Sequence, residues 1–351
     1  MSLIHLPQSK WASGTGRQVI LKSDFEKIEQ AVLEGLQLAL APPLEYVDQA
    51  SVRVNATSDC QARVLLCGFP SPVHPGQWVS GGLADGRYRE NSTSLVLNFA
   101  TSGHLWGTEK ADQWYAIYAL AGPSDTSFTL KALPVMRVSS QATQIITLRN
   151  NRDTGDIGHG FSSNELADGK ILVLSGASRG LARLITANNT DNGTAGTITY
   201  GGSALTLAPG DWFVVLPNTN FRYLGMVFNG SDSHLVPFAQ EGVQFTYSTP
   251  QQAASGAING YTLFDLGLFV PPTARRLRGY AAATGGSDLK LAVSYDGSNA
   301  ALILHGPAPS GDFQGLRGAV PFSCHLLEGS RLYFNNENTA NQVVQINGWE
   351  E

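Results

Sequence analysis

From Leu44 to the end of the chain, apolar and polar residues alternate in short runs. The runs Ser94–Ala100 and Gln113–Leu120 are strong strand candidates, because they contain β-branched and aromatic residues, and Asp211–Leu216 continues the pattern. Clusters rich in Gly, Asn and Pro separate the runs, which is typical of short strands joined by tight turns. The pattern predicts an all-β protein built from jelly-roll or β-sandwich domains and disfavours a βαβ fold.

Residues 23–40 have a different period and predict one short helix. Ser23 and Glu26 have the spacing of a capping box, and the prolines at 42–43 end the helix. Its apolar face recurs every three or four residues, at Phe25, Ile28, Val32 and Leu36. A lone helix of this length needs a partner. It either covers its own sheet or forms a short coiled coil with copies of itself.

The first 21 residues read as an extended N-terminal arm. Three of its apolar residues, which an arm cannot bury by itself, are Ile4, Leu6 and Trp11. The arm either packs back on its own domain or docks on a neighbouring subunit or particle. Docking is favoured, since termini that are not tethered are usually disordered and polar.

The remaining chain divides into two β regions. Residues 42–250 form a first β domain, in which about residues 140–217 read as an inserted β subdomain. The polar stretch Ser248–Asn259 has the composition of a linker. Residues 260–351 contain short strands in a number that suits one compact C-terminal β-sandwich.

Composition points to a protein with partners. Charged residues make up 15% of the chain, against roughly 25% in an average soluble domain. A surface with so few charges is expected to be covered in part by other subunits. The net charge is −5, and the sequence shows no basic stripe. No apolar run reaches membrane-spanning length. We therefore expect neither nucleic acid nor membrane as a partner.

Three cysteines, an odd number without paired spacing, argue against a disulfide scaffold. Cys60 and Cys67 could meet across a hairpin, but buried free thiols are the favoured interpretation. No signal peptide is recognised at the start of the chain. These features predict a soluble protein made in a reducing cytoplasm.

One segment matches a catalytic motif. Gly176–Gly180 has the glycine–x–serine–x–glycine pattern of an esterase nucleophile elbow around Ser178. An esterase needs a helix directly after the serine, whereas Leu181–Thr186 alternates like a strand. A hairpin turn is therefore the favoured interpretation, and we predict no enzymatic activity and no cofactor.

Other candidate sites are weaker. Asp153, Asp156 and His159 share a glycine-rich loop, where a cation site is conceivable but a solvated turn is favoured. The histidines show no metal-ligand spacing. Three tryptophans could stack on sugars: Trp78, Trp106 and Trp212. Core or interface positions are commoner for this residue.

Two segments carry a resemblance to a known family. The first is Gln113–Leu120, an aromatic strand that follows a loop at Gly103. The second is Phe221–Val227, which continues through Asn229-Gly230-Ser231 to Leu235–Gly242. They resemble a β module of tail and fibre proteins in tailed bacteriophages and prophages. That module has a strand with the pattern arginine–aromatic–small–glycine–apolar, then a turn, then the sequence Pro-Phe-x-Gln-x-Gly.

The C-terminal segment Leu277–Trp349 is similar to the terminal sandwiches of such fibres. In the family the two signature segments lie close in sequence, whereas about a hundred residues separate them here. Because Trp114 and Tyr118 lie on one face of their strand and Tyr115 on the other, the strand must be covered on both sides. In a fibre we expect the second cover to come from a neighbouring subunit.

The resemblance implies a non-enzymatic structural protein of the virion, assembled in the host cytoplasm. It implies a trimeric, fibre-like or tail- or baseplate-associated subunit that contacts other virion proteins. We expect the arm to anchor the protein and the helix face to gather the subunits. One alternative is an adhesin that binds a host cell-surface glycan through the C-terminal sandwich. Another is an enzyme, a depolymerase or esterase at Ser178.

Overall fold

A computed structural model describes residues 42–56, 62–74, 77–80, 88–101, 103–149, 158–191, 195–255, 260–283, 289–306, 319–327, 330–335 and 342–351. All regular structure among these residues is β, which confirms the all-β prediction, and no helix long and apolar enough to span a membrane occurs among them. The expected helix lies outside the described residues, as do the interface and anchor residues Ile4, Leu6, Trp11, Phe25, Ile28, Val32 and Leu36.

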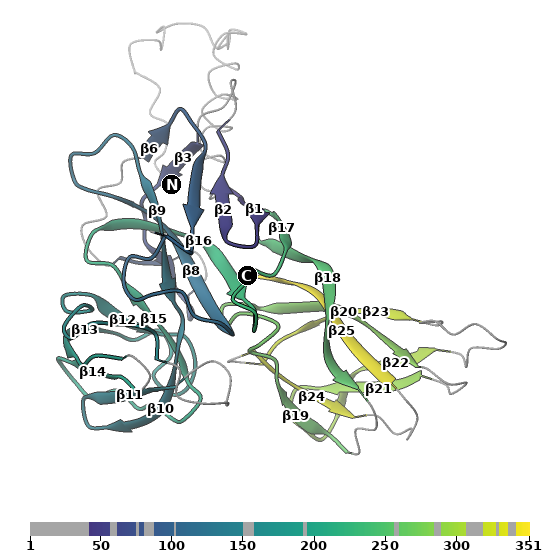
Figure 1. Ribbon diagram of the computed structural model, residues 1–351. Coiled ribbons are helices and arrows are strands. Elements are labelled where there is room, and N and C mark those ends of the chain that lie inside the picture. The colour runs from purple at the N-terminus through teal and green to yellow at the C-terminus, as the bar shows by residue number, and fades with distance from the viewer. Residues whose placement is uncertain are drawn as a thin grey trace, which may run out of the picture. The chain divides into compact units, whose positions relative to one another are not determined.

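The strands form several antiparallel sheets and one closed barrel (Figure 1). A three-stranded sheet contains β1 (Leu44–Asp48), β2 (Ser51–Val54) and β7 (Leu95–Asn98). Two small sheets pair β3 (Ala62–Leu65) with β6 (Tyr88–Asn91), and β4 (Phe69–Pro70) with β5 (Trp78–Val79). A second three-stranded sheet has the order β16 (Asn220–Asn229), β8 (Gln113–Ala121), β9 (Thr129–Pro134).

The barrel has the order β10 (Met136–Ala142), β11 (Ile145–Arg149), β14 (Thr197–Tyr200), β13 (Ala182–Asn188), β12 (Lys170–Val173), β15 (Trp212–Leu216). A five-stranded sheet has the order β17 (Phe238–Glu241), β18 (Gln244–Ser255), β25 (Gln342–Glu350), β20 (Arg276–Ala283), β23 (Val320–His325). A four-stranded sheet has the order β19 (Thr262–Asp265), β24 (Arg331–Asn335), β21 (Leu289–Ser294), β22 (Ala300–Gly306).

The pair β8–β16 is buried on both faces within one chain. Trp114 packs against the rings of Phe228 and Trp349 on one face. Tyr115 contacts Phe99 edge-on, with ring centroids 5.2 Å apart, on the other. The expectation that a neighbouring subunit supplies the second cover is therefore wrong. Aromatic residues from distant parts of the same chain supply it, which a strand pattern alone does not reveal.

The barrel explains why some strands lack alternation. In β15, Phe213 and Val215 point into the barrel core, whereas Trp212, Val214 and Leu216 belong to the larger core outside it. A strand that is buried on both faces has a continuous apolar run. The barrel closes where Met136 of β10 pairs with Phe213. Closure leaves no free sheet edge in this part of the fold.

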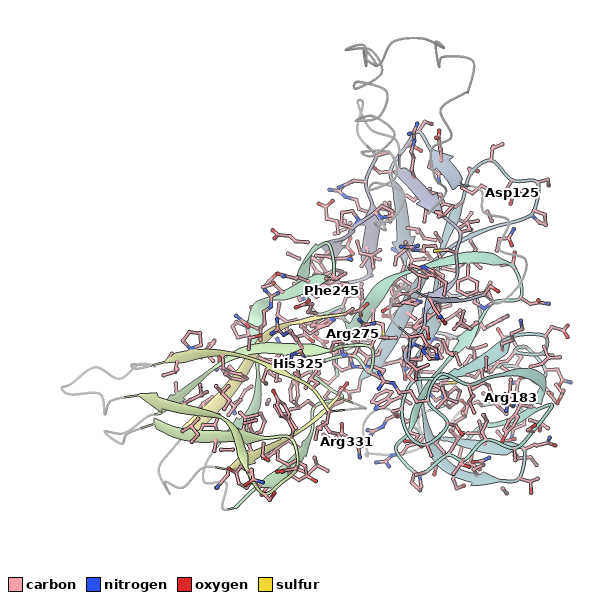
Figure 2. All side chains as sticks on the ribbon, turned by 180° about the vertical axis from the view of Figure 1, so that it is seen from behind. Asp125, Arg183, Phe245, Arg275, His325 and Arg331 are labelled. Atoms are coloured by element: carbon pink, nitrogen blue, oxygen red, sulfur yellow. The ribbon has the colours of Figure 1, made fainter. Side chains whose placement is uncertain are left out.

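In the C-terminal region, the five-stranded and four-stranded sheets contribute to the same apolar core. Leu277, Phe322 and Ile346 from the first sheet belong to it together with Leu332 and Phe334 from the second. Phe245 of β18, labelled in Figure 2, stacks on Trp349 with ring centroids 4.9 Å apart. These residues are the inward positions of their strands, and the intervening polar residues lie on the outer faces.

Candidate functional site

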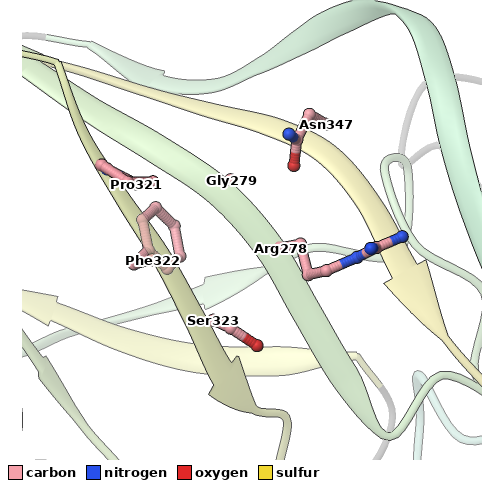
Figure 3. A pocket seen from close by; sticks show the side chains of 6 residues that line it. All are labelled: Arg278, Gly279, Pro321, Phe322, Ser323 and Asn347. Atoms are coloured by element: carbon pink, nitrogen blue, oxygen red, sulfur yellow. The ribbon is translucent and has the colours of Figure 1, made fainter.

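A cavity of about 370 Å³ opens at the five-stranded sheet. It is lined by Arg278, Gly279, Pro321, Phe322, Ser323 and Asn347. Figure 3 shows that these residues come from three neighbouring strands, β20, β23 and β25. Because the lining combines a guanidinium, a hydroxyl and an amide, the cavity can donate and accept hydrogen bonds.

A β-bulge shapes this cavity. In the pairing of β20 with β25, Gly279 lies opposite Ile346 and Arg278 lies opposite Gly348, so Asn347 is an extra residue. A bulge turns a side chain away from the regular alternation. Gly279 allows the close approach of the strands, since a Cβ atom there would lie 2.3 Å from the backbone oxygen of Gln345. The result is a hollow beside Asn347.

Arg278 of β20 is held in place from β18, on the other side of β25 in the sheet. Its Nη1 donates to Oε1 of Gln244 at 3.0 Å, and its Nη2 donates to Oγ1 of Thr246 at 3.1 Å. Such fixation prepares the guanidinium for recognition of a polar ligand. The lining residues include no carboxylate or histidine for acid–base work. The cavity is a candidate site for a polar ligand.

Comparisons with protein-family models, with curated protein sequences and with solved structures found no match. Among the candidates named from the sequence, a serine, a histidine and three tryptophans have well-defined surroundings in the structure.

Ser178 lies in the tight turn between β12 and β13. Its hydroxyl accepts a hydrogen bond from the backbone N–H of Thr206 at 2.7 Å. Gly176 and Gly180 have φ angles of 83° and 81°, which favour glycine, so both glycines of the motif serve the turn. The strand β13 follows, where an esterase would need a helix. The motif therefore has a conformational explanation.

His159 is buried in a polar clamp. Asp191 Oδ2 accepts from the backbone N–H of His159 at 2.9 Å and contacts its Nδ1 at 2.8 Å. Cβ atoms at Gly158 and Gly196 would lie within 3 Å of Asp191 atoms. Asp191 thus fastens two loops beside the barrel. The sequence marks Asn188–Asn192 as an Asn- and Asp-rich loop and favours a solvated turn there, but it does not indicate that Asp191 is buried against His159.

The other members of the proposed cation site, Asp153 and Asp156, lie outside the described residues. Among the residues that the structure does describe, no three His, Cys, Asp or Glu side chains gather in a way that would hold a metal ion.

The tryptophans differ in their availability to a sugar ring. Trp212 is buried, which agrees with its place in a core. Trp78 is 41% exposed, but the guanidinium of Arg222 lies 3.9 Å from its ring centroid. A cation over one ring face leaves at most the other for stacking. Trp106 is half-buried and packs against both apolar cores.

Two of the three cysteines are described, and both are free thiols. Cys324 is buried, and desolvation raises the pKa of its thiol to about 12. Burial also raises the pKa of Cys67, against the opposing effect of the adjacent Arg222 guanidinium. A protonated, buried thiol is a poor nucleophile. Cys60 lies outside the described residues.

Proposed function

We propose that the protein is a structural component of a tailed-phage virion, trimeric and either fibre-like or associated with the tail or baseplate. The observation that carries the proposal is the pairing of the two segments that resemble the phage module. Although about a hundred residues separate them in sequence, β8 and β16 pair along their length, from Gln113 opposite Asn229 to Ala121 opposite Asn220. The module's sheet is thus continuous despite the barrel between its strands.

The rest of the second segment also has an architectural role. Phe238 packs against the rings of Tyr46 and Phe245. Oε1 of Gln240 accepts from the backbone N–H of Leu44 at 2.7 Å, and its Nε2 donates to the carbonyl of Gly242 at 2.9 Å. Residues of the Pro-Phe-x-Gln-x-Gly segment therefore join β17 to β1 and shape the turn into β18. These structural roles support the proposal that the module is an architectural one.

In this proposal the arm anchors the subunit to other virion proteins through Ile4, Leu6 and Trp11. The helix gathers three copies through its apolar face, Phe25, Ile28, Val32 and Leu36. The β regions, which include a C-terminal β-sandwich or jelly roll, project outward or form a wall. The low charge content supports a surface that is partly covered by partners.

Light scattering on the purified protein tests the assembly. We expect the full-length chain and a variant lacking residues 1–21 to be trimers, and a variant lacking residues 1–41 to be a monomer. The variant lacking residues 1–21 removes the arm but keeps residues 23–40, and it serves as the matched control. A monomeric full-length chain, or a trimer that survives loss of residues 1–41, would contradict subunit gathering through the helix.

The alternative function is recognition of a host-surface glycan through the C-terminal region. The cavity beside Asn347 favours it, because an amide, a hydroxyl and a fixed guanidinium surround a hollow large enough for a sugar ring. Binding of the protein to host cells tests this alternative. Asn347→Ala and Ser323→Ala are expected to weaken binding, whereas Ser298→Ala, in an exposed turn, is the control. Equal binding by all variants would exclude this cavity.

A further inference from the structure

A second, smaller cavity of about 200 Å³ lies where the β12–β13 turn meets the beginning of β20 and the end of β23. Three of its lining residues are basic or can donate a hydrogen bond from a ring nitrogen: Arg179, Arg275 and His325. Apolar lining comes from residues that include Leu174, Pro272 and Leu326. Arg275 and His325 are labelled in Figure 2.

The two arginines of this cavity have no anionic partner in the described part of the chain. Other arginines do have one: Arg53 pairs with Glu45 at 2.7 Å, and Arg137 pairs with Asp265 at 2.5 Å. No hydrogen bond or ion pair joins the side chain of Arg179 or Arg275 to another described residue. Two like charges that line one small cavity repel each other, and an anion between them removes the repulsion.

The nearby carboxylate of Glu350 does not fill this role. The backbone oxygen of Glu350 accepts from the N–H of Arg275 at 2.8 Å. In the strand register, however, Glu350 lies opposite Arg276, and it is not among the residues that line the cavity. The lining residues include two arginines and no carboxylate.

The backbone fixes the position of both arginines. Arg179 lies in the glycine-bracketed turn, where its N–H donates to the carbonyl of Gly176 at 3.0 Å. The carbonyl of Arg275 accepts from the N–H of Leu326 at 3.0 Å. Backbones held in this way fix both residues at the edge of one cavity, so only the two side chains must become ordered when a ligand binds.

We propose that this cavity binds a phosphate monoester. A guanidinium presents a planar fork of donors that matches phosphate oxygens, and two such groups match the double negative charge of a monoester better than the single charge of a carboxylate. The ring of His325 adds a third donor. Leu174 and Pro272 supply buried apolar lining beside these donors. The inference is independent of the proposed virion role.

The volume limits what carries the phosphate. A cavity of about 200 Å³ is smaller than a typical drug-sized pocket and suits one phosphate group with at most a small ring attached. The ligand is therefore either the free phosphate ion or a phosphorylated sugar. The apolar lining would contribute to the affinity for the sugar phosphate but not to the affinity for the free ion.

Isothermal titration of the full chain at pH 7 and constant ionic strength tests the proposal. The probes are inorganic phosphate, glucose 6-phosphate and glucose. We expect saturable binding of one phosphate-containing probe per chain and none of glucose. Arg179→Gln and Arg275→Gln are each expected to weaken binding roughly ten- to hundredfold, as loss of a charge-assisted hydrogen bond predicts. Both side chains are exposed, so the thermal midpoint should not change.

The matched control is Arg183→Gln, which removes the same charge from β13 outside the cavity, where the guanidinium donates to the carbonyl of Ser203. Absence of saturable binding by both phosphate probes would overturn the proposal. Equal weakening by Arg183→Gln would also overturn it, since it would indicate a general charge effect. Tighter binding of glucose 6-phosphate than of inorganic phosphate would identify a phosphorylated sugar as the ligand, and equal affinities would identify the phosphate group alone.

Discussion

The carboxyl group of Glu351 makes the stability of the fold depend on pH near neutrality. Its oxygens accept hydrogen bonds from the hydroxyl of Tyr223 at 2.9 and 2.7 Å, and from Oγ1 of Thr273 at 2.9 Å. Desolvation outweighs these hydrogen bonds and raises the pKa of Glu351 from 4.5 to about 7. The folded protein therefore holds this proton more tightly than the unfolded chain does.

The sign and size of the effect follow from proton linkage. Because the pKa is raised in the folded state, the stabilisation is fully present below pH 4.5 and is lost as the pH rises through about 7. The shift corresponds to at most about 3 kcal/mol, since each pKa unit is worth about 1.4 kcal/mol. Partial access of solvent to Glu351 lowers this figure.

Urea unfolding of the protein and of Glu351→Gln, at several values between pH 4.5 and 8, measures the effect. The glutamine side chain resembles the protonated acid and does not titrate. We expect the two free energies of unfolding to be similar at pH 4.5, and the variant to be more stable at pH 8 by up to about 3 kcal/mol. Glu241→Gln, at an exposed carboxylate, is the control. A difference between Glu351→Gln and the parent that stays constant over this range would refute the reasoning.

Two further predictions concern packing in the central core. Trp114→Phe removes the hydrogen bond from Nε1 to the carbonyl of Gly267, 2.6 Å long and buried, and is expected to lower the free energy of urea unfolding by roughly 1–3 kcal/mol; an unchanged unfolding midpoint would contradict this. Gly225→Ala would place a Cβ atom 2.6 Å from the Phe245 ring and is expected to lower the free energy of unfolding by roughly 1–3 kcal/mol. The control Gly242→Ala, at φ 61° with open space around it, should cost less in the same assay, and equal losses would show that the ring contact is unimportant.

Local sequence patterns predicted strands well where one segment contains the whole signal. The expected strand Gln113–Leu120 corresponds to β8, Gln113–Ala121, and Asp211–Leu216 corresponds to β15, Trp212–Leu216. The closure of the barrel could not be predicted in this way. It depends on the pairing of Met136 with Phe213, and nothing local to either residue indicates the other.

The candidate sites show the same limit more strongly. The strand-like alternation after Ser178 was a local signal, and it correctly indicated a turn. The cavity beside Asn347 depends on a bulge, which shifts the register by one residue without altering the composition of the strand. The cavity proposed to bind phosphate is lined by Arg179 and Arg275, which come from segments almost a hundred residues apart. Their meeting is a property of the tertiary structure alone.

The barrel has a consequence for how this chain can change. Its first strand, β10, pairs with its last, β15, so the chain enters and leaves it at neighbouring points, shortly after β9 and shortly before β16. Its inner core is made from its own residues, but its outward-facing Trp212, Val214 and Leu216 belong to the larger core. A genetic exchange between positions 135 and 219 could therefore replace it with another sequence whose ends lie equally close and whose outer face is equally apolar, while the β8–β16 ladder keeps its register. The barrel is in this sense a cassette, and the point of insertion is where variation among related chains would concentrate.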